Sequence, residues 1–209
     1  MENLETLHKY FTLLVESYLK EHFPSGKAEV YTDKFCKTLN QLIKAPQNQP
    51  FFGNNIANLH AINPLFVIAF TKAISAENFT YEEIEAMIME IYTVMVKNLL
   101  EKQQQECENA KNPWKHFIET TKQGNHKLYD NKYFKLEYVV EDRLRFGFNI
   151  NRCYYYDIFK ANQHESLAPI LCKYDNLLAD NLNKWVRLQR NKTIAQGDSH
   201  CEFRYFRNI

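Results

Sequence analysis

Glycine and proline are scarce in this chain of 209 residues, which contains five and six of them respectively. Flexible linkers depend on such residues, so we expect no long linker. The chain also has no surplus of basic residues, because 26 lysines and arginines stand against 25 aspartates and glutamates. Neutralising the phosphates of a nucleic acid requires such a surplus, so we expect no nucleic-acid partner.

Signals for export and for disulfide formation are missing as well. Residues 1–5 lack the basic and apolar regions of a secretory signal, and the longest apolar run, residues 64–70, is too short to cross a bilayer. The five cysteines are an odd number without a CxxC pair, which argues against a disulfide framework and against a ribbon-type zinc site. We therefore expect a cytoplasmic protein with reduced thiols and no membrane partner.

Several common catalytic motifs are absent. The chain contains no HExxH, GxSxG, P-loop or GxGxxG sequence. Zinc proteases, ordinary serine hydrolases and common nucleotide-binding proteins are therefore poor fits. Apolar residues are plentiful at 45% of the total, which is enough to fill a real core.

The spacing of the apolar residues predicts an α+β fold. Repeats of three and four residues indicate helices, and strict alternation indicates strands. Helices are expected over residues 7–18, 35–43, 84–99, 114–118 and, in two or three short pieces, 151–182. Strands are expected over residues 133–140, 144–150, 185–190 and 201–206, the first two as an antiparallel hairpin. We expect an N-terminal helical bundle packed on a C-terminal antiparallel four-stranded sheet, with helices inserted between the strand pairs.

Local signals place some of the boundaries. Thr80 and Glu83 form a capping box that begins the helix over residues 84–99, and the polar residues 101–105 are expected to fray or to begin a connection. A break in the helical pattern at residues 123–126 divides a helical region, residues 1–125, from an α+β region, residues 126–209. We expect the two regions to form one compact unit.

Four residues in the C-terminal part are the candidates for catalysis: Cys153, Cys172, Asp175 and Cys201. Thiols and carboxylates can serve as nucleophiles, proton carriers or metal ligands. Cys172 and Asp175 lie three apart, on one face of the expected helix. Cys153 lies at an expected helix N-terminus, which favours its thiolate. Burial in the core remains the alternative for each thiol taken alone.

Alternation along the last strand places Cys201, Phe203 and Tyr205 on one face and leaves His200 on the other. His200 therefore cannot easily activate Cys201. Before this strand, Gly197 and Asp198 are typical of a turn.

Three further residues are candidates for substrate binding: Arg187, Arg190 and Tyr156. An arginine can hold a carboxylate by forked hydrogen bonds, although solvated surface charge is the alternative. Tyr156 belongs to a run of three tyrosines, residues 154–156, that would present rings around a helix.

Four strings in the C-terminal part resemble the L-2-amino-thiazoline-4-carboxylic acid hydrolase family. They are FNINRC, LCKYD, RNKTIAQGD and CEFRY, which begin at residues 148, 171, 190 and 201. The resemblance covers about residues 130–206. The closing string, with the preceding Gly-Asp, is also similar to the end of vinyl-reductase-type small-ligand domains.

The resemblance implies a hydrolase that acts on a small molecule and opens a cyclic amidine at a carbon–nitrogen bond other than a peptide bond. A thiolate of Cys153, Cys172 or Cys201 could attack the ring carbon, or could bind a metal that activates water, while Asp175 carries protons. An arginine would hold the carboxylate. A non-catalytic sensor for a small ligand or metal is the alternative. Neither a cofactor nor the oligomeric state is fixed by the sequence.

Overall fold

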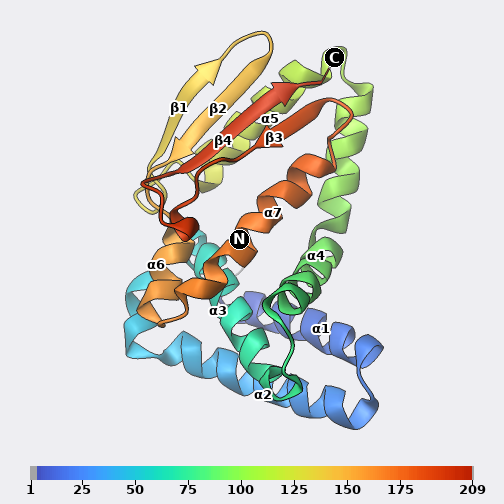
Figure 1. Cartoon of the computed structure of the whole chain (residues 1–209), viewed down its shortest axis with the longest axis vertical. Coiled ribbons are helices and arrows are strands. Elements are labelled where there is room, and N and C mark those ends of the chain that lie inside the picture. The colour runs from blue at the N-terminus through green and yellow to red at the C-terminus, as the bar shows by residue number, and fades with distance from the viewer. Residues whose placement is uncertain (1–3, 209) are drawn as a thin grey trace. The chain divides into compact units, whose positions relative to one another are not determined.

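A computed structural model describes residues 4–208 and confirms the α+β class, with helices first and a four-stranded antiparallel sheet in the C-terminal part (Figure 1). Two compact units make up the chain. The first comprises the residues up to Met95 together with Tyr155–Leu171, and the second comprises Val96–Tyr154 together with the residues from Cys172 onward. This division differs from the expected boundary at residue 125, because the chain passes between the units three times, after residues 95, 154 and 171.

The first unit is built from helices. They are α1 (Leu4–His22), α2 (Ser25–Lys44), α3 (Asn55–Ala73), the first part of α4 (Tyr81–Asn109) and most of α6 (Tyr154–Ala161), with short 3₁₀ turns η1 (Pro46–Phe51), η2 (Ser75–Glu77) and η3 (Glu165–Leu167). The segments predicted as helices over residues 7–18 and 35–43 lie inside α1 and α2. Phe66 of α3 packs against Phe11 of α1, with ring centroids 4.9 Å apart.

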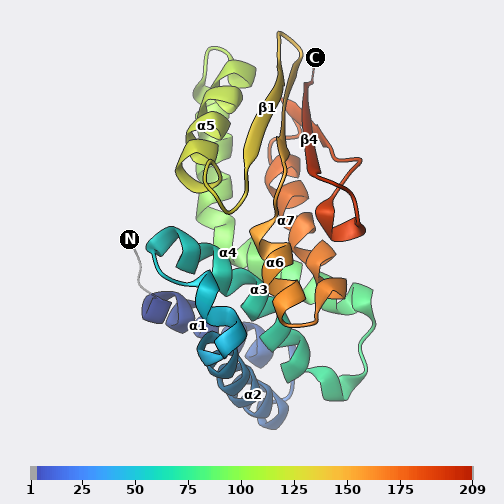
Figure 2. The ribbon, with the colours of Figure 1, turned by 90° about the vertical axis from the view of Figure 1, so that its left-hand side faces the viewer.

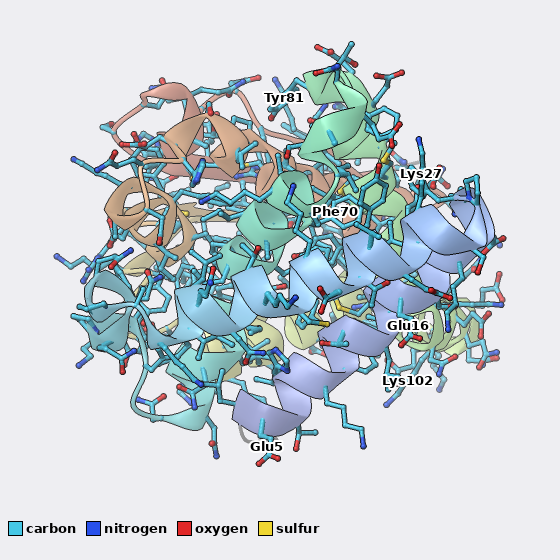
Figure 3. The ribbon with its side chains drawn as sticks, turned by 90° about the horizontal axis from the view of Figure 1, so that it is seen from below. Glu5, Glu16, Lys27, Phe70, Tyr81 and Lys102 are labelled. Atoms are coloured by element: carbon cyan, nitrogen blue, oxygen red, sulfur yellow. The ribbon has the colours of Figure 1, made fainter. Side chains whose placement is uncertain are left out.

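Helix α3 was not predicted as a helix, because it has no polar face to reveal a helical period. By length and composition it could cross a membrane, which corrects the expectation that no segment is long enough. However, 67% of its apolar window is buried within the described protein. In Figure 3 the labelled Phe70 of α3 lies among the helices, whereas the charged Glu16 and Lys27 lie at the surface. Helix α3 is therefore the core helix of the first unit.

Helix α4 begins at the predicted capping box. The Glu83 N–H donates to Thr80 Oγ1 at 3.2 Å, and the Thr80 N–H donates to Glu83 Oε2 at 2.8 Å. The expectation that residues 101–105 fray or begin a connection is wrong, because the helix continues to Asn109. Burial of Cys107 and a hydrogen bond of 2.9 Å from Asn181 Nδ2 to the Leu100 carbonyl hold this end.

The second unit contains the sheet. Its elements are the end of α4, α5 (Pro113–Leu128), β1 (Leu136–Glu141), β2 (Arg145–Ile150), most of α7 (Ala168–Asp180), β3 (Val186–Gln189), a 3₁₀ turn η4 (Ile194–Gln196) and β4 (Cys201–Arg207). The strand order is β1-β2-β4-β3, and every neighbouring pair is antiparallel. All four strands were predicted, and β4 lies in the middle between β2 and β3.

One face of this sheet is apolar and covered. Register pairs Phe146 with Tyr205 and Phe148 with Phe203, so aromatic rings of β2 and β4 lie side by side on this face. The predicted alternation in β4 is confirmed by its burial, since Cys201, Phe203 and Tyr205 are the buried members. Helix α5 runs along this face, where Phe117 contacts Tyr205 with ring centroids 4.9 Å apart (Figure 2). Cys201 therefore points into the interior of the second unit.

Candidate functional site

The sulfur of Cys201 accepts hydrogen bonds from two directions. The backbone N–H of Ile194 donates to it at 3.3 Å, and the thiol of Cys153 is also hydrogen-bonded to it. Strand register explains the second contact. Ile150 at the end of β2 is the partner of Cys201 at the start of β4, so the chain leaving β2 brings Cys153 beside it. Cys201 is 4% exposed, while Cys153 is half-buried.

Arg190 connects the end of β3 to helix α7. Its Nη1 donates to Asp175 Oδ2 at 2.5 Å and to the Cys172 carbonyl oxygen at 3.1 Å. Its guanidinium carbon lies 4.2 Å from the centroid of the Phe203 ring on the covered face. Only 7% of the Arg190 side chain is exposed, against 29% of Asp175. A largely buried cation is thus held between the helix and the sheet by one carboxylate, one carbonyl and one aromatic ring.

These surroundings lower the pKa of the Cys201 thiol to about 7. The hydrogen bond with Cys153 is the largest cause, and the Ile194 N–H and the positive charge of Arg190 act in the same direction. Burial and the Asp175 carboxylate oppose them. Because hydrogen bonds to the charged form favour ionisation, Cys201 carries more thiolate near neutral pH than an ordinary cysteine does.

Cys172 and Asp175 are shifted in the opposite direction. Burial raises the pKa of the Cys172 thiol to about 12, and the charge of Arg190 only partly offsets it. Burial also raises the pKa of the Asp175 carboxyl, with Arg190 again opposing. Cys172 is therefore a neutral thiol at physiological pH. Of the two thiols, Cys172 and Cys201, only Cys201 is activated as a nucleophile.

Arg190 has a buried donor without a partner in the described residues. Its Nε is buried and has no hydrogen-bond partner among the described residues. Such an atom costs free energy in the absence of a partner, and buried polar groups without one are rare in proteins. A ligand with an acceptor oxygen would satisfy it.

The structure brings together all four residues that the sequence suggested for catalysis, and one of the three suggested for substrate binding. Arg187 does not join them. It pairs in register with Phe206, whose ring lies 4.7 Å below its guanidinium carbon, so it occupies the face opposite Cys201. Tyr156 belongs to the first unit, so its role remains a prediction. His200 Nδ1 lies 3.0 Å from the Ser199 hydroxyl.

The contribution of Ile194 could not be found in the sequence. A backbone N–H is present at almost every residue, and only the folded loop directs this one at a sulfur. Within residues 4–208, no group of three or more histidine, cysteine, aspartate or glutamate residues is arranged to hold a metal ion. A separate hollow of about 340 Å³, lined in part by Arg145, Arg204 and Phe206, lies on the opposite face of the sheet.

Comparison with known proteins gives the family. The sequence profile of the family described as L-2-amino-thiazoline-4-carboxylic acid hydrolase matches residues 60–205, which is more than half of the chain. The chain belongs to this family. No curated protein and no solved structure matched it.

The match to the L-2-amino-thiazoline-4-carboxylic acid hydrolase family contains Cys153, Cys172, Asp175, Arg190 and Cys201. It also begins at residue 60, well before the stretch of about 130–206 expected from the four strings. The family profile therefore includes most of α3 and the whole of α4 and α5, while α1 and α2 lie outside it.

Proposed function

We propose that the chain is a hydrolase that opens a cyclic amidine at a carbon–nitrogen bond, with L-2-amino-thiazoline-4-carboxylate as the substrate to test first. Cys201 is the nucleophile in this proposal. The observation that carries it is the pair of donors, the Cys153 thiol and the Ile194 N–H, at the Cys201 sulfur. Both stabilise a thiolate, the nucleophilic form of cysteine.

In the first step the Cys201 thiolate attacks the ring carbon that carries the exocyclic nitrogen. A sulfur–carbon bond forms and the bond from that carbon to the ring nitrogen breaks. The departing nitrogen keeps the bonding pair and takes a proton from Asp175. In the substrate complex Asp175 is in its acid form, because burial raises its pKa and the substrate carboxylate replaces it as the counter-charge of Arg190. The product of this step is a thioimidate on Cys201 and a free amine on the substrate.

In the second step water attacks the same carbon. Asp175 recovers a proton from the water, and Cys201 leaves as thiolate with the electron pair of the sulfur–carbon bond. The released molecule is a ring-opened thiocarbamate that contains one water more than the substrate. The enzyme returns to its starting protonation state, so the two steps balance.

Arg190 is assigned to the substrate carboxylate. The support is its unsatisfied Nε donor, because a guanidinium presents its N–H groups in a fork that matches carboxylate geometry. Its remaining contacts to Asp175 and Cys172 fix its position. Because the chemistry requires a reduced Cys201, we also propose a cytoplasmic location.

The test compares two cysteine variants of the full chain. Hydrolysis of L-2-amino-thiazoline-4-carboxylate is followed by chromatography and mass spectrometry of the ring-opened product. Cys201→Ser is expected to lower kcat/KM at least about 100-fold, because a serine hydroxyl is a much weaker nucleophile at pH 7. Cys36→Ser is the matched control, since Cys36 lies in α2 of the first unit and its thiol donates to the Thr12 hydroxyl at 3.8 Å. Absence of turnover by the unaltered protein, or full turnover by Cys201→Ser, would contradict the proposal.

A further inference from the structure

The loop from Thr193 to Asp198 is closed by contacts between its two ends. Asp198 Oδ2 accepts a hydrogen bond of 2.8 Å from the Thr193 N–H, and the Asp198 N–H donates to the Thr193 carbonyl at 3.2 Å. Gly197 permits the tight path between them with a left-handed φ of 95°. Thr193 itself is buried, at 6% exposure. Asp198 is thus hydrogen-bonded to the buried Thr193 through both its side chain and its backbone.

The hydrogen bonds between Asp198 and Thr193 determine the direction of the Ile194 N–H. The Thr193 carbonyl and the Ile194 N–H belong to one rigid peptide plane, so fixing the carbonyl also orients the N–H. The Gln196 N–H donates to the same carbonyl at 3.0 Å. With its plane held in this way, Ile194 directs its N–H at the Cys201 sulfur, 3.3 Å away.

We propose that Asp198 is a positioning residue for Cys201: its carboxylate holds the Thr193–Asp198 loop so that the Ile194 N–H stabilises the Cys201 thiolate. The inference rests on the proposed role of Cys201 as nucleophile and adds to it a residue that touches neither the sulfur nor the substrate. It also extends the sequence-based interpretation of Asp198 as a turn residue, because the turn orients a backbone donor toward the Cys201 sulfur.

If Asp198 acted on Cys201 directly through its charge, replacing it would shift the pKa of the Cys201 thiol in the opposite direction from the shift expected of a positioning residue. A carboxylate near a thiol disfavours the thiolate, so removing that charge would lower the thiol pKa. Loss of the positioning contact removes a donor from the thiolate and raises the pKa instead. The sign of the change therefore separates the two explanations.

The experiment measures the rate of iodoacetamide alkylation of Cys201 against pH in the substrate-free full chain, with each cysteine quantified on its own peptide by mass spectrometry. Asp198→Ala is expected to raise the thiol pKa by about one unit, which slows alkylation at pH 7 roughly fivefold. Asp198→Asn is expected to stay near the unaltered protein, because its amide oxygen can accept the same hydrogen bond. Cys36 supplies the internal control for the reagent.

A third variant removes the donor itself. Ile194→Pro deletes the N–H at the first position of η4, and Thr193, at φ −141° and ψ 139°, already has the extended conformation that a residue before proline adopts. We expect it to raise the pKa of Cys201 at least as much as Asp198→Ala.

An unchanged or lowered pKa in Asp198→Ala would overturn the inference, and so would an unchanged pKa in Ile194→Pro. Circular dichroism and thermal unfolding check that each variant is folded. Should Asp198→Ala fail to fold, the other two variants decide: a rise in Ile194→Pro without a rise in Asp198→Asn supports the inference, and any other pattern overturns it. Because no substrate is used, the result is independent of whether the protein hydrolyses a thiazoline.

Discussion

The guanidinium of Arg190 and the carboxylate of Asp175 form an ion pair of 2.5 Å in which the arginine side chain is only 7% exposed. Removing a charged group from water is costly, and the partner charge offsets that cost. The pair therefore holds α7 against the sheet as long as both members are charged.

Replacing Asp175 by asparagine should lower the free energy of unfolding by about 2–4 kcal/mol, because it leaves a buried cation without its counter-charge. Urea denaturation at pH 7 measures this. The matched control is Asp33→Asn, which breaks the pair between Lys37 and Asp33; these side chains are 70% and 60% exposed, so we expect a change below about 0.5 kcal/mol. Equal losses in the two variants would show that Arg190 does not depend on Asp175.

Removing the Cys153 thiol should raise the pKa of Cys201 above its value of about 7. Cys153→Ala deletes the hydrogen bond that contributes most to lowering that pKa, so the thiolate fraction at pH 7 falls and alkylation slows by roughly fivefold for a shift of one unit. Cys153→Ser keeps an O–H donor and should preserve most of the reactivity. The rate of iodoacetamide alkylation against pH checks both variants, and identical profiles for alanine and the unaltered protein would count against the hydrogen bond.

Cys172 should make the folded state less stable at alkaline pH. Its folded pKa of about 12 lies above the pKa of about 8.5 of a free thiol, so the unfolded state ionises first as pH rises. The contribution of Cys172 is complete below pH 8 and is lost between about pH 8.5 and 12, by at most about 1.4 kcal/mol per pH unit. Unfolding free energies at pH 8 and 10.5 should therefore fall less in Cys172→Ala than in the unaltered protein. An equal fall in both proteins would contradict the assignment.

Gly147 should not tolerate a side chain. A Cβ at this position would lie 2.7 Å from the Phe203 carbonyl oxygen and 2.9 Å from Arg204 Cδ, so Gly147→Ala should destabilise the protein by about 1–3 kcal/mol. Gly124 in α5 is the control, because nothing lies within 4 Å of its Cβ position. Gly124→Ala should stabilise the helix by about 0.5–1 kcal/mol, since alanine is the better helix former. Thermal unfolding of the two variants should shift in opposite directions.

Much of the secondary structure could be predicted because it is a local property. The helices over residues 7–18 and 35–43, the capping box at Thr80 and all four strands follow from spacing between near neighbours. The wrong predictions, at α3 and at the end of α4, have a common cause, which is contact with distant parts of the chain. Helix α3 is buried on nearly all sides and has no polar stripe, and the polar end of α4 is held by Asn181, which is far away in the sequence.

The candidate site was predictable in its residue types but not in its arrangement. Cysteines, an aspartate and arginines stand out in the sequence as reactive side chains. Arg187 and Arg190 could not be told apart, because only the register of β3 against β4 decides which face each one occupies. Likewise, nothing in the sequence distinguishes Cys201 from Cys172.

The sequence by itself determined most of the helices, all four strands and which side chains could react, because those properties depend largely on a residue and its near neighbours. Only the tertiary structure decided that β4 lies between β2 and β3, that Cys153 and the Ile194 N–H meet the Cys201 sulfur, and that Arg190 is buried against Asp175. The physical reason is that hydrogen bonds, desolvation and charge act through space. The pKa of a thiol is therefore set by groups that the folded chain brings beside it from distant positions.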